Sequence, residues 1–203
     1  VINIGGISNV TILPATGSPV LGFDTGPGNG LMDAWTRRNL DTEFDDRGRW
    51  AASGAIVSKL LRAMLNDPYF QLEPPKSTGF EYFNLNWLMR FDVDQFDPAN
   101  VQATLCELTA ASIAAAINER AATTEQTFVC GGGTHNTELM RRLSKKLPYS
   151  SVANTSDADL APEWVEAVAF AWLAMRTING KTGNLPSVTG AKHKVVLGDI
   201  HLS

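Results

Sequence analysis

Apolar and polar positions alternate over short stretches at the start of the chain. The stretches that predict β-strands are residues 1–4, 9–13 and 19–23. Residues 14–18 (PATGS) are typical of a turn between the second and the third strand. The adjacent glycines Gly5 and Gly6 follow the first strand directly. Because glycine weakens a strand, this pair indicates a turn or a close approach of another group to the backbone.

Farther along, apolar residues recur with the period of an amphipathic helix. The predicted helices cover residues 29–39, 52–68, 100–121, 136–147 and 162–178. Asn29 could cap the first of them, and Asp67–Pro68 ends the second. In that second helix the apolar residues form one stripe: Ile56, Val57, Leu60, Leu61, Met64 and Leu65.

Short apolar runs at residues 127–130 and 149–156 predict two more strands, and residues 195–197 form one strand-like piece in the tail. Residues 66–98 are rich in proline and aromatic side chains and are predicted as a loop-rich insertion. The order is three strands, helices, then alternating strands and helices. It predicts an α/β fold with a mixed sheet flanked by helices.

Composition narrows the range of functions. The chain has 203 residues and a formal net charge of −4 at pH 7, which gives no support for a nucleic-acid partner. The basic cluster at residues 141–146 is typical of one solvated helix face. With only two cysteines and no apolar stretch of bilayer length, we expect a cytoplasmic protein without a membrane partner.

Three glycine clusters fall at predicted strand ends. They are Gly5–Gly6, Gly26 with Gly28, and Gly131–Gly132–Gly133. Bare backbone N–H groups can bind phosphate, and Ser8, Asn9 and Asn29 could add side-chain donors. Each cluster alone is also consistent with a plain turn, but three together favour a nucleotide. Neither the Walker pattern nor the dinucleotide pattern G-x-G-x-x-G is present.

Several motifs carry a family resemblance over residues 2–198. They include NIGGISNVT, GFDTGPGN, PKSTG, GGGTHN, EAVAFAWLA and GNLPSVTGA. Together the motifs resemble the anhydro-N-acetylmuramic acid kinases. This family belongs to the superfamily of sugar kinases, actin and heat-shock ATPases, in which two ribonuclease-H-like domains clamp ATP.

The resemblance implies that residues 1–203 are the C-terminal ribonuclease-H-like domain of such a kinase. The N-terminal domain, with a first phosphate loop and an aspartate general base, would lie upstream of Val1. It implies ATP and Mg²⁺ as cofactors, and the partners would be the missing domain and a second copy of the chain. One departure is Phe80, which stands where the family pattern PKSTGRE has arginine.

Individual residues have two interpretations each. Asp24 could orient Mg²⁺-bound water, as the one catalytic candidate in the chain, or could brace a turn. Glu166 lies on the alanine-rich side of its predicted helix, which we expect to face inward; it could bind a sugar hydroxyl or form a salt bridge. Lys76 and Ser77 could line the sugar site or brace their loop. The histidines lack the spacing of zinc ligands.

The resemblance implies an activity. ATP would phosphorylate the 6-position of 1,6-anhydro-N-acetylmuramic acid while water opens the anhydro bridge, in cell-wall sugar recycling. The alternative is a non-catalytic module in which ATP drives domain closure, as in the actin and chaperone branches. PKSTG and GNLPSVTGA resemble the sugar kinase rather than those branches.

Overall fold

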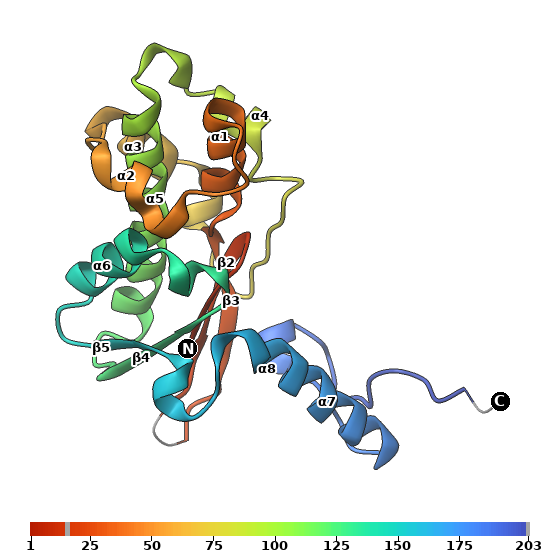
Figure 1. Cartoon of the computed structure of the whole chain (residues 1–203). Coiled ribbons are helices and arrows are strands. Elements are labelled where there is room, and N and C mark those ends of the chain that lie inside the picture. The colour runs from red at the N-terminus through yellow and green to blue at the C-terminus, as the bar shows by residue number, and fades with distance from the viewer. Residues whose placement is uncertain (15–16, 202–203) are drawn as a thin grey trace.

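A five-stranded mixed sheet forms the centre of the structure, a computed structural model that describes residues 1–14 and 17–201 (Figure 1). The strands are β1 (Ile2–Ile4), β2 (Ile7–Ile12), β3 (Leu21–Pro27), β4 (Gln126–Cys130) and β5 (Ser151–Asn154), in the order β3-β2-β1-β4-β5. Strand β2 runs antiparallel to β1 and β3, whereas β1, β4 and β5 pair in parallel. This topology confirms the predicted α/β fold of ribonuclease-H-like type. Four strands therefore end at the same edge of the sheet.

Helices cover the sheet and build the upper part of the molecule in Figure 1. They are α1 (Gly30–Leu40), α2 (Arg49–Ser53), α3 (Ser58–Leu65), α4 (Leu85–Met89), α5 (Pro98–Arg120), α6 (Thr137–Lys146), α7 (Val165–Ile178) and α8 (Pro186–Thr189). Helix α5 begins where the Asp97 side chain accepts hydrogen bonds from the N–H groups of Ala99 and Asn100. It packs against β2, β3 and α6, and its alanines allow that close approach.

The helix predicted over residues 52–68 is interrupted at residues 54–57, between the end of α2 and the start of α3. The chain is extended at Gly54, and α3 begins only at Ser58. A Cβ atom on Gly54 would overlap the carbonyl group of Ala99, so α5 lies directly against this backbone. The N–H of Ala55 donates to Asn100 Oδ1 and that of Val57 to Thr104 Oγ1. Side chains of α5 thus take the bonds that a helix would have made internally.

The strands near the N-terminus differ from their predicted bounds. Strand β2 begins at Ile7 rather than at Asn9, and β3 continues to Pro27 rather than ending at Phe23. The pairing of β2 with β3 shifts between Ser8, which pairs with Gly26, and Asn9, which pairs with Asp24. This bulge accommodates the longer β3. The turn predicted over residues 14–18 lies partly outside the described residues. Residues 195–197 form no strand.

The loop-rich segment of residues 66–98 folds around the buried carboxylate of Asp67. This carboxylate accepts hydrogen bonds from Tyr82 Oη (2.6 Å), Trp87 Nε1 (2.8 Å) and Arg90 (3.1 Å). Aromatic rings pack edge to face around it, with Phe83 at the centre. The segment is therefore a compact unit, and residues 76–80 run from it along the free edge of β3.

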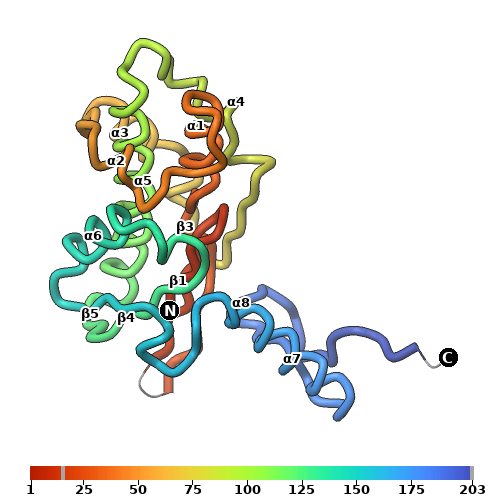
Figure 2. The backbone as a smooth tube through the Cα atoms, in the orientation of Figure 1, coloured from red at the N-terminus to blue at the C-terminus, as the bar shows by residue number. Residues whose placement is uncertain are grey.

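Helix α7 projects away from the sheet, as the tube in Figure 2 shows. No residue of α7 is buried, although the helix carries large apolar side chains such as Phe170, Trp172 and Ile178. Short helix α8 contacts β3, where Val188 lies against Gly22. Within the described part of the chain, every helix is too short or too polar to cross a membrane.

Candidate nucleotide and substrate site

Two glycine turns lie side by side at the carboxyl edge of the sheet. Gly5 and Gly6 connect β1 to β2, and Gly131–Gly133 follow β4, which pairs with β1. A cavity of about 250 Å³ opens between these turns and the start of α7. Its lining residues are Asn3, Gly5, Cys130, Gly131, Gly132, His135, Pro162, Glu163, Val165 and Glu166. The sequence-predicted clusters at Gly5 and Gly132 thus meet in one cavity.

At Gly5 and Gly132 the backbone is open to this cavity. A Cβ atom on Gly5 would meet nothing closer than 3.6 Å, and one on Gly132 would first meet Asn29 Nδ2 at 3.6 Å. In the described part of the chain, the N–H groups of Gly6 and Gly132 have no acceptor. Open N–H groups of this kind, grouped at strand and helix ends, suit an anion such as phosphate.

The glycines after β3 have a different role from the predicted one. Gly26 lies inside the strand with its backbone against the Phe70 ring. The N–H groups of Gly28, Asn29 and Gly30 donate to carbonyl groups of Gly5 and Gly6. These donors are therefore used for folding and are not available to a ligand.

Ser8 and Asn9 also differ from the expectation. Ser8 is fully buried, and its hydroxyl bonds to Thr25 Oγ1 at 2.6 Å, so it is no free donor. Asn9 is half-buried in β2 and pairs with Asn3 of β1 and with Asp24 of β3. Paired residues of neighbouring strands share a face, so these three polar side chains form a row across the sheet.

This polar row, defined as Asn3, Asn9 and Asp24, lies on the face opposite the core. Ile2, Ile4, Val10 and Phe23, which alternate with its members, are buried. A Cβ atom on Gly131 would overlap Asn3 Oδ1, so one end of the row is at the glycine-lined cavity. Asp24 is two strands away, about 10 Å at the usual strand spacing.

Asp24 is held on three sides. Its N–H donates to the Lys76 carbonyl (3.2 Å), its carbonyl accepts from Tyr69 Oη (2.8 Å), and its carboxylate accepts from Thr78 N–H (2.8 Å). Burial raises the pKa of the Asp24 carboxyl, and the Thr78 hydrogen bond offsets only part of that rise. The second carboxylate oxygen accepts no hydrogen bond in the described chain. The Thr78 hydroxyl is buried without a partner among the described residues.

Glu166 does not have the inward, buried position that the sequence suggested. Its side chain is exposed, because the first turn of α7 packs on nothing that would cover it. It nevertheless lines the glycine cavity together with Glu163, whose carboxylate lies 3.6 Å from His135 Nε2. Glu166 therefore reaches the cavity from an exposed position and not from the buried position that the sequence predicted.

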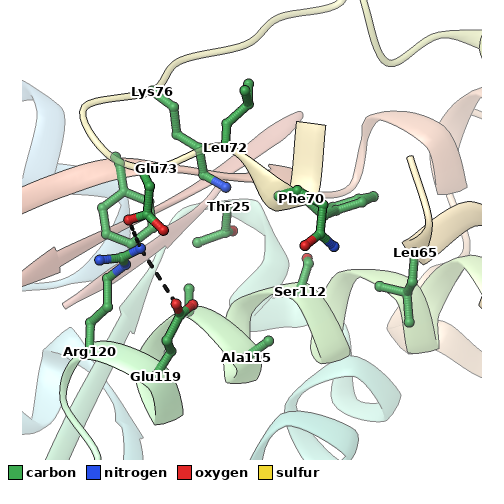
Figure 3. A pocket seen from close by; sticks show the side chains of 13 residues that line it. Thr25, Leu65, Phe70, Leu72, Glu73, Lys76, Ser112, Ala115, Glu119 and Arg120 are labelled. Carbon is green, nitrogen blue, oxygen red and sulfur yellow. Dashed lines mark hydrogen bonds and ion pairs between the residues drawn. The ribbon is translucent and has the colours of Figure 1, made fainter. Parts of the chain in front are cut away.

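Lys76 lies apart from this cavity. Its ammonium group enters a second cavity of about 150 Å³ between β3 and α5, shown in Figure 3. There it packs over the Tyr69 ring, 4.9 Å from the centroid, and near Arg120, and burial lowers its pKa. Arg120 pairs with Glu73 and Glu119, so the cavity carries charges of both signs. Ser77 is exposed next to Lys76.

Three residues of the site were not singled out as binding residues from sequence. Asn3 belongs to the polar row, Thr78 holds Asp24, and the Phe80 ring lies against Gly6 and Gly30. Strand alternation could have placed Asn3 beside Asn9. No local pattern gives the contacts of Thr78 and Phe80, because they depend on how a distant loop returns to β3.

Comparison with protein families matches residues 1–203 to "Anhydro-N-acetylmuramic acid kinase". The chain is 49% identical over 203 residues to the anhydro-N-acetylmuramic acid kinase of Coxiella burnetii (strain Dugway 5J108-111), covering 99% of this chain and 55% of the relative. It is 50% identical to that of Xylella fastidiosa (strain Temecula1 / ATCC 700964), covering 99% and 53%. The chain thus spans about half the length of these relatives.

Among solved structures, one that matches is the activator of the 2-hydroxyisocaproyl-CoA dehydratase from Clostridium difficile with bound ADPNP. The match has 11% sequence identity and a TM-score of 0.47, and it covers 80% of this chain and 54% of that one. The family match over residues 1–203 and the relatives at about 49% identity are sufficient to assign the family. The chain belongs to the anhydro-N-acetylmuramic acid kinase family.

Proposed function

We propose that residues 1–203 act as the C-terminal part of a longer kinase, here named the two-part kinase, in the cytoplasm. It would use ATP to convert 1,6-anhydro-N-acetylmuramic acid to N-acetylmuramic acid 6-phosphate. The observation that carries the proposal is the polar row, which runs across the sheet from the open glycine turns at Gly5 and Gly132 to Asp24. Family membership supports the substrate class.

The glycine turns would bind the nucleotide. The N–H groups of Gly6 and Gly132 are free to donate to a ligand. A phosphate has several oxygens that accept from both turns at once, whereas a single carbonyl group does not. The exposed carboxylate of Glu166 would accept hydrogen bonds from hydroxyl groups of the sugar, and Ser77 would donate to the same substrate. Lys76 is better assigned to bracing β3 from its own cavity.

Asp24 would be the general base. Water attacks the anomeric carbon of the anhydro sugar while its proton passes to Asp24, and the bond between that carbon and O6 breaks. O6 takes the γ-phosphoryl group, and ADP leaves. A carboxyl whose pKa is raised by burial is the better base, and Thr78 fixes its direction. The expectation of a base upstream of Val1 stays untested.

The donor set fits Mg²⁺ only in part. No group of three metal-binding side chains occurs among the described residues. Mg²⁺ commonly has one or two carboxylate ligands and takes the rest from phosphates and water. Asn9, which pairs with Asp24 across the strands, offers an amide oxygen. Asp24 would orient water bound to the ion rather than bind the ion itself, which leaves its carboxylate free to act as the base. When bound there, the ion would neutralise phosphate charge.

The test is a coupled assay of ADP release by the two-part kinase with and without anhydro sugar. We expect sugar-dependent turnover, and we expect Asp24→Asn to lower kcat by about 10²–10⁴-fold, the usual loss for a general base. In the wild type, kcat should fall as the pH drops through the raised pKa of Asp24.

Asp94→Asn is the matched control, because it makes the same change at a surface carboxylate that pairs with Arg38 and is not among the residues of the site. ATP turnover that sugar does not change would favour the ATP-gated module instead. An Asp24→Asn variant that keeps full kcat would return Asp24 to a structural role and shift the base to another residue.

A further inference from the structure

Phe80 places an exposed aromatic ring beside the phosphate-binding turn. A Cβ atom on Gly6 would overlap the tip of this ring, and one on Gly30 would come within 2.7 Å of Cε1. The side chain is nevertheless 63% exposed. The ring is therefore fixed at its tip by two glycines, while most of its surface is open to solvent.

The position of Phe80 is set by the same segment that holds Asp24. Thr78, two residues earlier, donates its N–H to the Asp24 carboxylate, and the Phe80 carbonyl accepts from Asn84 Nδ2 at 2.9 Å. The ring thus contacts the Gly5–Gly6 turn, and the segment that carries it also holds the proposed base. The sugar, whose O6 takes the γ-phosphoryl group of ATP while Asp24 removes a proton from the attacking water, would lie next to this ring.

Packing within the protein does not account for this ring. Apart from Phe96, the other aromatic side chains of residues 66–98 form a continuous series of ring pairs from Tyr69 to Phe91. Phe80 takes part in no ring pair in the described chain, and it turns away from that cluster toward the glycines. Leaving so much apolar surface in water costs free energy that a ligand could recover.

We propose that Phe80 is a positioning residue for the sugar, on which the apolar C–H face of the pyranose ring packs. Aromatic rings have a negative face that attracts polarised C–H groups, and sugars present such a face opposite their hydroxyl groups. This inference rests on the proposed function and adds which side chain orients the acceptor. Because a phenyl ring is uncharged, the contact it makes does not weaken with salt.

The test uses the two-part kinase with Phe80 replaced by Ala, Leu or Tyr. We expect Phe80→Ala to raise KM for the anhydro sugar about tenfold while KM for ATP and the melting temperature stay nearly constant. Phe80→Leu keeps apolar bulk without a π face and should give a KM between those of the wild type and Phe80→Ala. Phe80→Tyr adds a hydroxyl at Cζ, the ring atom nearest Gly6, so it should displace the ring and also raise KM for the sugar.

Phe44→Ala is the matched control, since Phe44 is 62% exposed on the loop after α1 and lies outside the site. It should change neither KM. The salt dependence of KM for the sugar should be the same in the wild type and in Phe80→Ala. Equal rises of both KM values in Phe80→Ala, or no change in either, would overturn the inference. Absence of sugar phosphorylation in the wild type would instead overturn the proposed function.

Discussion

At Gly132 the backbone is open to the cavity, whereas one residue later Gly133 is pressed against the Ile4 side chain. Neighbouring glycines therefore serve different purposes. Gly132 leaves room for a ligand, and Gly133 leaves room for the core. A substitution at each position separates binding from stability, which is how ligand-binding glycines can be distinguished from packing glycines.

We predict that Gly132→Ala and Gly132→Val weaken ATP binding in graded steps, with a rise in Kd of more than tenfold for Val, about 1.4 kcal/mol. The added carbon atoms would occupy the place of a phosphate or the nucleoside, but they meet no protein atom closer than Asn29. Isothermal titration and thermal melting measure both effects.

Gly133→Ala is the paired control and should behave in the opposite way. Its Cβ would overlap Ile4, so we expect a loss of about 1–3 kcal/mol in the free energy of unfolding. If Gly132→Val binds ATP with unchanged Kd while remaining folded, the nucleotide does not reach this turn.

Sequence reasoning located the glycine turns but not the purpose of each glycine. Periodicity placed Gly5–Gly6 and Gly131–Gly133 at strand ends, and β1 and β4 do bring them together. The sequence could not predict that a side chain would have space at Gly5 but not at Gly6. At Gly6 that space is filled by the ring of Phe80, which is too far along the chain for a local pattern to reveal the contact.

At the scale of elements, the fold of residues 66–98 depends on the buried side chain of Asp67. Burial alone would raise the pKa of Asp67, but the hydrogen bonds from Tyr82, Trp87 and the Tyr69 N–H, with the charge of Arg90, outweigh it and lower the pKa. A carboxyl with a lowered pKa stabilises the fold above its ordinary pKa, and this contribution disappears as the pH falls through the lowered value.

We therefore predict that Asp67→Asn lowers the free energy of unfolding by about 2 kcal/mol or more at pH 7, because an amide cannot accept from all four donors. The difference from the wild type should narrow as the pH falls below 3.8, the ordinary pKa of the group. Urea denaturation at pH 7 and at lower pH measures it.

Asp94→Asn serves as the comparison for this element. Asp94 pairs with Arg38 on the surface, so its loss should cost less than about 1 kcal/mol. An equal, pH-independent loss in both variants would show that charge at Asp67 does not matter.

The wrong start predicted for α3 shows that local periodicity does not reveal tertiary hydrogen bonds. The apolar stripe from Ile56 to Leu65 has helical spacing, and its last four residues lie in α3. Ile56 and Val57 lie outside the helix, because Asn100 and Thr104 of α5 accept the N–H groups of Ala55 and Val57. Competition from a tertiary hydrogen bond cannot be deduced from the period of a local sequence. Helix α5, whose cap and proline are both local signals, was predicted to within two residues.

For the whole molecule, the apolar surface of α7 is the main feature without a partner among the described residues. Phe170 and Ile178 are 71% and 74% exposed. Exposed apolar side chains in such a group mark a surface that another protein part covers. In the two-part kinase we expect the N-terminal part to cover this helix.

We predict that the 203-residue chain alone self-associates and lacks sugar-dependent turnover. One wall of the cleft would be absent, so substrates would be neither positioned nor shielded from water. Light scattering over a range of concentrations and the ADP-release assay measure the two effects.

A variant with Phe170→Ser and Ile178→Ser should self-associate less and remain inactive. A chain that stays monomeric at high concentration, or that turns over substrate by itself, would contradict this account.

Among the strands of this sheet β1 comes first in the chain, yet it lies in the middle of the sheet, between β2 and β4. During synthesis its β2 side can pair at once, whereas its other side waits for residues 129 and 130. At about 5–20 residues per second this interval lasts on the order of 10 s. Until then the nascent chain presents an unpaired, apolar strand edge, which is the kind of surface that chaperones protect. The topology that assembles the glycine turns therefore leaves β1 open to wrong pairing until β4 has been synthesised.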